Sequence, residues 1–421
     1  MQFLRRYQAP DEFVTFYQSQ EKVKLPTYKF KPNDVRGIWV SNVANIDTPI
    51  MKDLKSYQSY LKDMIERIAS YNFNTIIFQV RPASDAYYPS KLNPWSRFIT
   101  GVEGQDPGFD VLQFVIDEAL KYNIKVHAWM NPYRVSLSSL DKLVMTKEEY
   151  LNSLDDLNFA KRNPDETILD GINKIILKPS SSQVIDFVSD TVKEIIENYD
   201  IEGIHIDDYF YPYAKINPKF EEEDYLTYLK AHKEISFDDW RRLNVDKMIK
   251  SIHDVVKDSL NKNHKKVLFG ISPFGIYRTH SSINPLGWDK GSFHSSNVLQ
   301  CYNELYSDIY LWMKNGWIDY VVPQIYFPFE RLDVSYHNLT KWWSEIALET
   351  KTYLYIGQAL YQMGSNEFWQ NPDEITNQLR FNQLFSNISG TIFFTYRDLI
   401  SGQNSVKDEA LQRLKALWTN K

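Results

Sequence analysis

The chain has 421 residues, of which 43% are hydrophobic and 15% aromatic, and it carries a formal net charge of −6. A chain of this length and apolar content can bury a large core, as one large α/β domain or as two average ones. The acidic balance argues against a nucleic-acid-binding protein, which would carry a basic stripe. The single cysteine, Cys301, excludes an intramolecular disulfide and any cysteine-rich metal site.

The N-terminal residues bear on localisation. Residues 1–20, MQFLRRYQAPDEFVTFYQSQ, contain no continuous apolar segment and do not form a signal peptide as they stand. No stretch approaches the roughly 18 apolar residues that a membrane-spanning helix needs. The sequence as written predicts a cytoplasmic protein. If an export signal has been removed, the protein belongs to the cell envelope or the exterior, and both alternatives stay open.

Short β-like segments alternate with helical ones from residue 33 onwards. Residues 1–32 show no clear period, and we expect them to form an N-terminal extension packed on the main domain. Eight strands are then predicted in the segments Val35–Asn42, Asn74–Pro82, Lys125–Val135, Gly203–Tyr213, Lys266–Gly275, Ile318–Phe327, Thr352–Leu360 and Gly390–Leu399. Helical segments such as Leu54–Tyr71 separate them.

This alternation over residues 33–421 predicts a single α/β domain, a (β/α)₈ or TIM barrel. A doubly wound sheet is the alternative, but it would need a glycine-rich first turn, which the sequence lacks. No repeat, low-complexity tract or flexible linker divides the chain.

Polar and aromatic side chains gather where the predicted strands end, which is where barrels of this kind carry out chemistry. They are Gln79, Arg81, Asp85 and Tyr88 on strand two and its loop; His127, Trp129, Asn131, Tyr133 and Arg134 on strand three; Asp207, Asp208, Tyr209 and Tyr211 on strand four; Gln324 and Tyr326 on strand six; and Tyr396, Arg397 and Asp398 on strand eight.

The period of two along a strand predicts which of these side chains point inward. On strand four, Ile204 and Ile206 should face outward, and His205, Asp207 and Tyr209 should face the barrel interior. On strand three the same rule places His127, Trp129 and Asn131 inside. Asp208 lies just past the strand, where the loop could turn it toward the same cleft.

Each of these residues also has a structural interpretation. A lone barrel aspartate such as Asp207 often pairs with a neighbouring arginine, and Asp208 could cap a turn or helix. His127 and His205 are more typical of hydrogen-bonding support than of catalysis. The aromatic residues are a weak signal alone, because the chain has 28 tyrosines. Together with the carboxylates they favour a sugar site, since sugar rings present flat C–H faces that stack on aromatic rings.

Six segments occur in a fixed order along the chain: RGIWVSN, FNTIIFQVRPASDAYYPS, KYNIKVHAWMNPYRV, GIHIDDYFYP, FGISPFGIYR and DYVVPQIYF. This set resembles the glycosyl-hydrolase-like family 10, a group of bacterial barrel proteins once described as a domain of unknown function. The similarity covers about Asn33 to the C-terminus. It implies a glycosidase-like barrel acting on bacterial envelope glycans. Some relatives cleave peptidoglycan strands that lack stem peptides, and these are usually exported or lipid-anchored. This sequence departs from them in having no signal peptide or lipobox.

The same resemblance matches particular residues. Asp207 and Asp208 match the acidic motif of strand four, and Asp85 matches the loop after strand two. Gln324 and Tyr326 match the motif of strand six.

Glycoside hydrolysis usually needs one carboxylic acid to protonate the leaving oxygen and a second group to stabilise or attack C1. Asp207 is the best first candidate, as nucleophile or orienting base. Strand five, GISPFGIYR, has no carboxylate, so the partner is sought among Asp208, Asp85, Asp398, Asp289 and Glu330. In a second route the acetamide of an N-acetylated sugar attacks C1. Asp207 and Asp208 with Tyr326 are similar in outline to chitinase-like barrels. In either route one carboxyl group should have a raised pKa.

The sequence therefore predicts a glycoside hydrolase for an N-acetylated polysaccharide of the bacterial envelope, such as peptidoglycan strands. No cofactor, metal or nucleic-acid partner is expected. The expected catalytic residues are Asp207, Asp208 and Asp85. The expected substrate-binding residues are Arg81, Tyr88, His127, Trp129, Asn131, Tyr133, His205, Tyr209, Tyr211, Gln324, Tyr326, Tyr396 and Asp398.

Two other functions remain to be weighed. An inactive glycan-binding barrel would tolerate Asp207→Asn without losing glycan affinity. A metal-dependent barrel hydrolase would use His127, His205 and Asp207 as ligands. The sequence disfavours the second, because the first strand has no His-x-His pair and strands five and six are poor in ligands.

Overall fold

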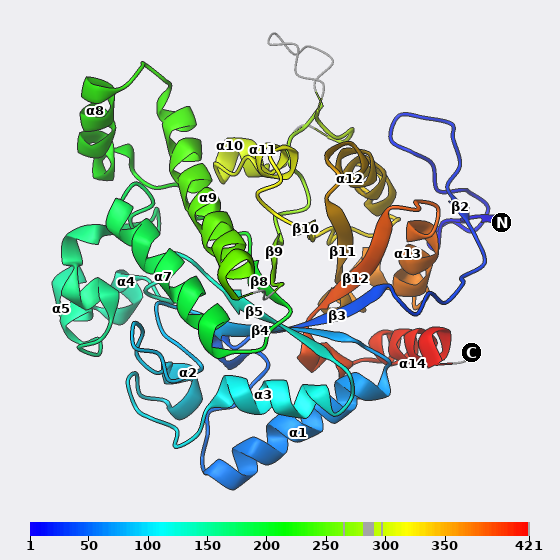
Figure 1. Ribbon diagram of the computed structural model, residues 1–421. Coiled ribbons are helices and arrows are strands. Elements are labelled where there is room, and N and C mark those ends of the chain that lie inside the picture. The colour runs from blue at the N-terminus through cyan, green and yellow to red at the C-terminus, as the bar shows by residue number, and fades with distance from the viewer. Residues whose placement is uncertain (264–265, 281–289, 296–297, 420–421) are drawn as a thin grey trace.

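A computed structural model describes residues 1–263, 266–280, 290–295 and 298–419, and it confirms the predicted barrel (Figure 1). Eight parallel strands close in the order β10-β11-β12-β3-β4-β5-β8-β9. They are β3 (Val35–Val40), β4 (Thr75–Arg81), β5 (Lys125–Met130), β8 (Gly203–Ile206), β9 (Leu268–Ile271), β10 (Tyr320–Val321), β11 (Tyr353–Ala359) and β12 (Ile388–Phe394). Each lies in its predicted segment, except that β12 begins two residues before Gly390.

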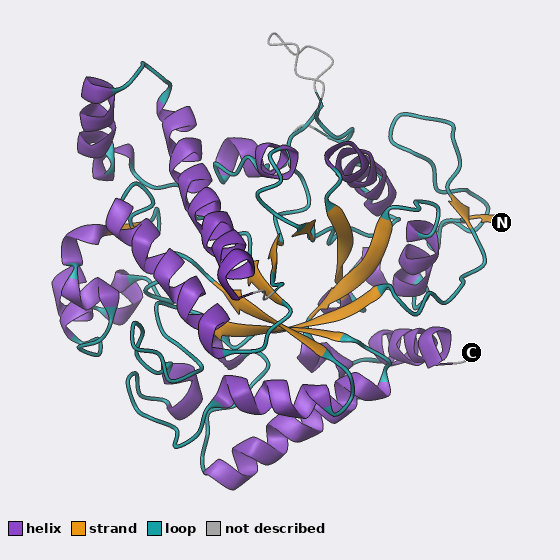
Figure 2. Ribbon diagram, in the orientation of Figure 1, coloured by secondary structure: helices purple, strands orange, loops and turns teal. Residues whose placement is uncertain are grey.

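Helices surround the strands (Figure 2). The helices that follow successive strands are α1 (Leu54–Ser70), α3 (Val111–Leu120), α7 (Ser182–Asn198), α9 (Phe237–Asn263), α11 (Ile309–Lys314), α12 (Tyr336–Thr350), α13 (Glu374–Asn382) and α14 (Ser405–Thr419). Shorter helices lie in the loops: α2 (Arg97–Thr100), α4 (Leu140–Leu143), α5 (Lys147–Asn152), α6 (Phe159–Arg162), α8 (Glu222–Ala231) and α10 (Cys301–Glu304).

Helix α1 shows how the local sequence specifies these elements. Asp53 precedes it, and its side-chain oxygen accepts a hydrogen bond from the N–H of Ser56 at 2.9 Å, which caps the helix start. Tyr57, Leu61 and Ile68 are buried, and their spacing of three to four residues per turn places them on one face. That face turns toward the barrel and α3, which lies beside α1 (Figure 1).

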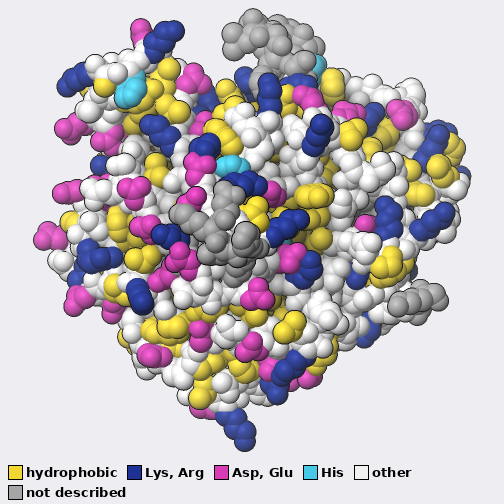
Figure 3. Space-filling view, viewed as in Figure 1, with side chains coloured by type: hydrophobic (Ala, Val, Ile, Leu, Met, Phe, Trp, Pro, Cys, Tyr) yellow, Lys and Arg dark blue, Asp and Glu magenta, His cyan; other side chains and the backbone are white. Residues whose placement is uncertain are grey.

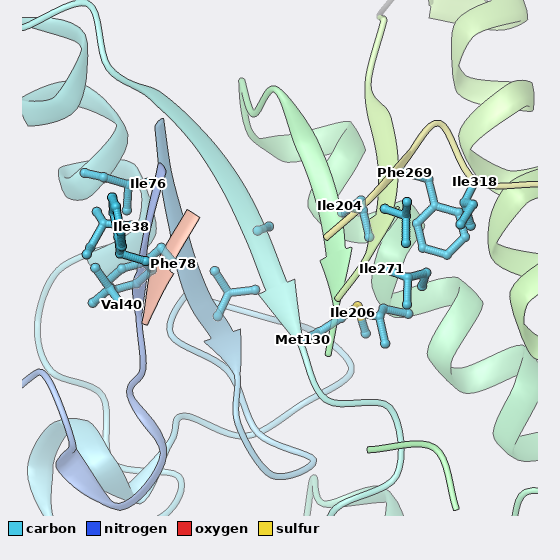
Figure 4. Close-up of a cluster of buried hydrophobic side chains, with 14 of the residues drawn as sticks. Ile38, Val40, Ile76, Phe78, Met130, Ile204, Ile206, Phe269, Ile271 and Ile318 are labelled. Atoms are coloured by element: carbon cyan, nitrogen blue, oxygen red, sulfur yellow. The ribbon is translucent and has the colours of Figure 1, made fainter. Parts of the chain in front are cut away.

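The core has two layers, one on each side of the strands. Outward side chains pack against the helices, and Figure 4 labels Ile38, Val40, Ile76, Phe78, Met130, Ile204, Ile206, Phe269, Ile271 and Ile318 among them. A separate cluster fills the barrel interior: Trp39, Ile77, Trp129, Tyr320, Val322, Tyr355 and Ile392. Burying each large apolar side chain contributes about 1.5–3 kcal/mol, so both layers hold the strand ends in place.

The N-terminal residues pair β1 (Gln2–Phe3) with β2 (Lys24–Leu25) and lie beside α13 (Figure 1). Val14 and Val23 from this segment are fully buried in the main core cluster. The N–H of Tyr17 donates to the side chain of Asn338 on α12 at 3.2 Å. These contacts attach residues 1–32 to the barrel, whereas the domain boundary at residue 32 stays a prediction.

The surface and the helices bear on possible partners. On the face in Figure 3, acidic and basic side chains are interspersed rather than gathered in one basic stripe. Within the described ranges, no helix combines the length and apolar character needed to cross a membrane.

Candidate active site

A cavity of about 360 Å³ opens at the carboxyl ends of the barrel strands. Every strand contributes to its lining, either directly or through the residues just after it: Trp39, Gln79, Trp129, Asp207, Ser272, Gln324, Tyr361 and Phe394. Asp208, Arg134, Tyr209, Tyr213 and Tyr326 also line it. The cavity therefore lies where (β/α)₈ barrels carry out chemistry.

Asp207 is held by three hydrogen-bond donors. Its carboxylate accepts from the indole N–H of Trp129 at 3.1 Å and from the side-chain amide of Asn131 at 3.1 Å and 3.3 Å, one distance to each carboxylate oxygen. The backbone N–H of Tyr209 donates at 3.2 Å. Burial raises the pKa of Asp207, while the charge of Arg134 and these donors act in the opposite direction. The structure thus fixes the orientation of this carboxyl group.

Asp208 has a different set of partners and a clearly raised pKa. The hydroxyl of Tyr213 donates to one carboxyl oxygen, and Gln324 also forms a side-chain hydrogen bond with it. Burial and the negative charge of Asp207 raise the pKa of Asp208 to about 6. Two adjacent carboxyl groups in one cavity therefore differ in their tendency to hold a proton, which is the pairing that acid–base work on a sugar requires.

Aromatic rings form the walls beside this pair. Tyr209 is 43% exposed, and the guanidinium of Arg134 lies 4.8 Å from its ring centre. The ring of Tyr213 lies 5.3 Å from that of Tyr209. Tyr326 and Phe394 also line the cavity, with 6.3 Å between their ring centres. These faces suit the flat C–H surfaces of sugar rings.

The two predicted histidines lie beneath the cavity rather than in it. The indole N–H of Trp39 donates to Nε2 of His205 at 3.2 Å, so Nδ1 of His205 carries the proton and donates to the hydroxyl of Tyr320 at 3.0 Å. That hydroxyl in turn donates to Nδ1 of His127 at 2.8 Å. Burial lowers the pKa of His127 to about 3 and that of His205 well below its usual range. Both rings are neutral supports of the barrel interior.

Gln79 of strand two lines the cavity, but the other three predicted residues of this strand and its loop lie away from it. Arg81 is fully buried and donates to the backbone oxygen of Asn131 at 2.5 Å. Asp85 accepts from the backbone N–H of Ala83 at 2.8 Å and from the side chain of Ser96, and burial raises its pKa to about 6. Tyr88 donates to Glu194 at 3.2 Å. None of the three predicted residues lines the cavity, so the structure does not bring Asp85 to the Asp207–Asp208 pair.

The remaining candidates are likewise engaged elsewhere. The hydroxyl of Tyr211 donates to Glu221 at 2.8 Å, and Tyr396 is buried. Asp398 pairs with Lys407 at 2.6 Å, and Glu330 pairs with Arg6 of the N-terminal segment at 3.4 Å. Asp289 lies outside the described residues. Asn131 and Tyr133 line a neighbouring cavity of about 440 Å³.

Sequence reasoning missed several lining residues, among them Trp39, Tyr361 and Phe394. The period of two on the first strand, RGIWVSN, would have placed Trp39 inside. Tyr213 stands in the aromatic run after Asp208, but nothing in the run says which ring returns to the carboxylate.

The structure does not gather the metal-ligand set that the sequence suggested. Across the described ranges, no group of three His, Cys, Asp or Glu side chains is placed to hold a metal ion. His127 and His205 instead share the hydroxyl of Tyr320, and Asp207 is bound to Trp129 and Asn131.

A (β/α)₈ barrel with paired carboxyl groups in a cavity at its strand ends has the architecture of a glycosidase. Residues 34–373 match the family described as Glycosyl hydrolase-like 10, and the chain belongs to that family.

Two curated relatives show the same similarity at the sequence level. The chain is 34% identical to glycosyl hydrolase YngK of Bacillus subtilis over 380 residues, which cover 89% of this chain and 70% of that protein. It is 33% identical to glycosyl hydrolase DigH of Escherichia coli K12 over 404 residues, which cover 91% of this chain and 87% of that protein. The protein is a glycoside hydrolase.

The fold is also similar to the catalytic domain of beta-amylase from Paenibacillus polymyxa, with a TM-score of 0.56. The likeness covers 91% of this chain and 98% of that chain. At 12% sequence identity it concerns the fold alone.

Proposed function

We propose that the enzyme cleaves an N-acetylated polysaccharide of the bacterial envelope, such as peptidoglycan strands, with Asp207 and Asp208 as its catalytic carboxyl groups. The observation that carries the proposal is the contrast between the two adjacent groups in the cavity. Asp207 is bound by three donors and lies near the charge of Arg134, whereas burial and the charge of Asp207 raise the pKa of Asp208 to about 6. The aromatic walls and the resemblance of the strand motifs support a sugar substrate.

In this proposal Asp208 is the general acid. A carboxyl group with a pKa near 6 retains a proton under mildly acidic conditions and can deliver it to the leaving glycosidic oxygen. Because Asp207 lies near the positive charge of Arg134, we take it to ionise before Asp208, and its negative charge then keeps the proton on its neighbour.

Asp207 is better suited to orient a group than to attack C1. Trp129, Asn131 and the backbone of Tyr209 hold the carboxylate in one orientation and stabilise its negative charge, which makes it a weak nucleophile that can still accept a hydrogen bond. These contacts favour the route in which the acetamide oxygen of the substrate attacks C1 while Asp207 accepts the acetamide N–H. The hydroxyl of Tyr326, which lines the same cavity, would hold the acetamide oxygen.

The test measures product release from peptidoglycan glycan strands without stem peptides and from chitooligosaccharides. We expect Asp207→Asn and Asp208→Asn each to lose at least about a hundredfold in kcat, as the loss of an acid–base group predicts. The exposed Asp165, which does not line the cavity, supplies the matched control, and Asp165→Asn should keep wild-type rates.

The outcomes separate the parts of the proposal. If wild type releases no product from either glycan, the substrate class is wrong. If the two variants keep wild-type rates, the assignment of the carboxyl groups is wrong. De-N-acetylated strands test the acetamide route, because cleavage of these strands at the wild-type rate would contradict it while leaving the two carboxyl groups in place.

A further inference from the structure

Gln324 follows β10 at the mouth of the barrel, and the segment after β9 packs closely against its backbone. Its N–H donates to the backbone oxygen of Pro273 at 2.9 Å. At Gly275 a Cβ would lie 2.4 Å from the backbone oxygen of Gln324. These contacts leave the backbone of Gln324 little freedom, although its side chain lines the cavity.

The side-chain amide of Gln324 is fixed as well. Its Nε2 donates to the backbone oxygen of Ser272 at 2.9 Å. A carbonyl oxygen can only accept, so this contact decides which end of the amide is the nitrogen. The same side chain forms a hydrogen bond with the carboxyl group of Asp208 and lowers its pKa, as a donor to the ionised form does. Gln324 therefore links the end of β9 to Asp208.

Ser272 is in turn anchored on the barrel interior. The indole N–H of Trp39 donates to Nε2 of His205, so this nitrogen carries a lone pair, and the Ser272 hydroxyl 2.9 Å away donates to the same atom. The other ring nitrogen of His205 contacts the hydroxyl of Tyr320 at 3.0 Å. A buried, neutral histidine thus holds the residue whose carbonyl binds Gln324.

Other groups that face Asp208 hold it less firmly. The hydroxyl of Tyr213 also donates to its carboxyl group, but Tyr213 is 39% exposed and stands in an irregular segment. The like charge of Asp207 raises the pKa of Asp208 and does not orient it. The charge of Asp208 itself raises the pKa values of three further neighbours, Tyr209, Tyr326 and Cys301.

We propose that Gln324 is a positioning residue, whose amide holds the carboxyl group of Asp208 in the orientation that proton transfer to the substrate needs. The inference rests on the proposed role of Asp208 as general acid and adds the residue that orients it. The sequence suggested instead that Gln324 binds the substrate. The two roles make opposite predictions, because a residue that only binds the sugar leaves the titration of Asp208 in the free enzyme unchanged.

The first measurement needs no substrate. The protein is labelled with carbon-13 at the carboxyl carbon of aspartate, and the signal of Asp208 is assigned by its absence from Asp208→Asn. Titration followed by NMR gives the pKa of Asp208, which we expect at about 6 in wild type. Gln324→Met keeps the length of the side chain and removes the donor, so this pKa should rise by at least about 0.5 pH unit.

Gln324→Glu keeps the shape of the side chain and tests the direction of the hydrogen bonds. The oxygen that faces the carbonyl of Ser272 must carry a proton, which leaves an oxygen without hydrogen facing Asp208. The pKa of Asp208 should therefore rise further than in Gln324→Met. Because only aspartate is labelled, the new glutamate adds no signal.

Gln358→Met is the matched control. Gln358 is a fully buried glutamine on the adjacent strand β11, and its Nε2 donates to the side chain of Gln378 at 2.8 Å. It does not line the cavity, so this variant should leave the pKa of Asp208 at the wild-type value.

The second measurement separates kcat from KM for cleavage of the glycans named above, at pH 5, where Asp208 is largely protonated. Gln324→Met should lower kcat at least about tenfold, because the acid is no longer held in place, and should keep KM within about threefold of wild type. A raised KM with an unchanged kcat would instead assign Gln324 to substrate binding.

An unchanged pKa of Asp208 in Gln324→Met would overturn the inference, and so would an equal shift in Gln358→Met. Circular dichroism shows whether each variant folds, and if Gln324→Met does not, the titration of Gln324→Glu decides in its place. If wild type cleaves neither glycan, the proposed function fails on its own, and the titration still decides whether Gln324 holds Asp208.

Discussion

Two loops of the barrel carry buried aspartates that look alike by burial and pKa but differ in their surroundings. Asp85 follows β4 and is 2% exposed, and Asp208 follows β8 and is 5% exposed. Burial raises the pKa of each to about 6. Asp85, however, is bound to Ala83 and Ser96 of its own loop, whereas Asp208 lines the cavity beside Asp207. A raised pKa therefore does not by itself identify a catalytic acid, and the surface that the carboxyl group faces decides its role.

The charges around the two groups reinforce this difference. The positive charge of Arg81 opposes the rise in the pKa of Asp85, and Arg81 is itself bound to the neighbouring strand. The nearest charge that acts on Asp208 is the like charge of Asp207, which keeps the proton on Asp208. The strand-two loop thus uses its carboxyl group to hold a backbone turn, and the strand-four loop directs its carboxyl group to the cavity.

The largest expected contrast is in activity. Asp85→Asn should keep kcat within about threefold of wild type, since it touches no cavity residue, while Asp208→Asn loses about 10²–10⁴-fold. Rates of product release at pH 6, normalised to the folded fraction seen by circular dichroism, measure both. A hundredfold loss in a folded Asp85→Asn enzyme would place Asp85 in the reaction and remove the contrast.

The second contrast is in how the free energy of unfolding changes with pH. The pKa of Asp85 is raised in the folded state, so wild type loses stability as the pH rises from about 4, where the unfolded group ionises, to about 6. The full rise in the pKa of Asp85 corresponds to a loss of about 3 kcal/mol in the free energy of unfolding. Asp85→Asn cannot ionise, so its free energy of unfolding relative to wild type should increase over this range and stay constant above it. Denaturant unfolding at pH 4, 5, 6 and 7 measures the difference, and a flat difference would show that Asp85 ionises freely when folded.

The sequence predicts the barrel well because its signals are local. Alternation along β5 and β8 correctly places His127, Trp129, Asn131, His205 and Asp207 on inward faces, since period two follows from strand geometry alone. Height along the barrel axis is harder to predict. His127 and His205 support the interior below, whereas Asn131 and Asp207 reach the mouth, and only the register between strands decides this.

The loops were less predictable because their contacts depend on the path of the backbone. Asp85 is turned into its own loop by the N–H of Ala83, two residues before it. Tyr213 returns to Asp208 across five residues of an irregular segment. Gly171 packs closely against the backbone of Lys215, a contact between regions about 40 residues apart in sequence that no local pattern encodes.

The smallest expected effect concerns the pKa of Asp208 itself. If Asp208 must be protonated to act, kcat/KM should fall about tenfold for each pH unit above about 6. The hydroxyl of Tyr213 donates to the ionised carboxylate and so lowers its pKa. Tyr213→Phe removes this donor, and a hydrogen bond of about 0.5–1.5 kcal/mol corresponds to a rise of up to about one pH unit. The alkaline limb of the plot of kcat/KM against pH should therefore move to higher pH.

Tyr209→Phe is the matched control for this shift. Tyr209 lines the same cavity, but its side chain makes no hydrogen bond to Asp208 in the described part of the chain, so the alkaline limb of this variant should stay near pH 6. The comparison separates the loss of one donor to the acid from the general loss of a cavity hydroxyl, which would change KM without moving the limb. Removing a donor to the charged carboxylate can only raise the pKa of that group. If the alkaline limb of Tyr213→Phe stays in place or moves to lower pH, a group other than Asp208 supplies the proton.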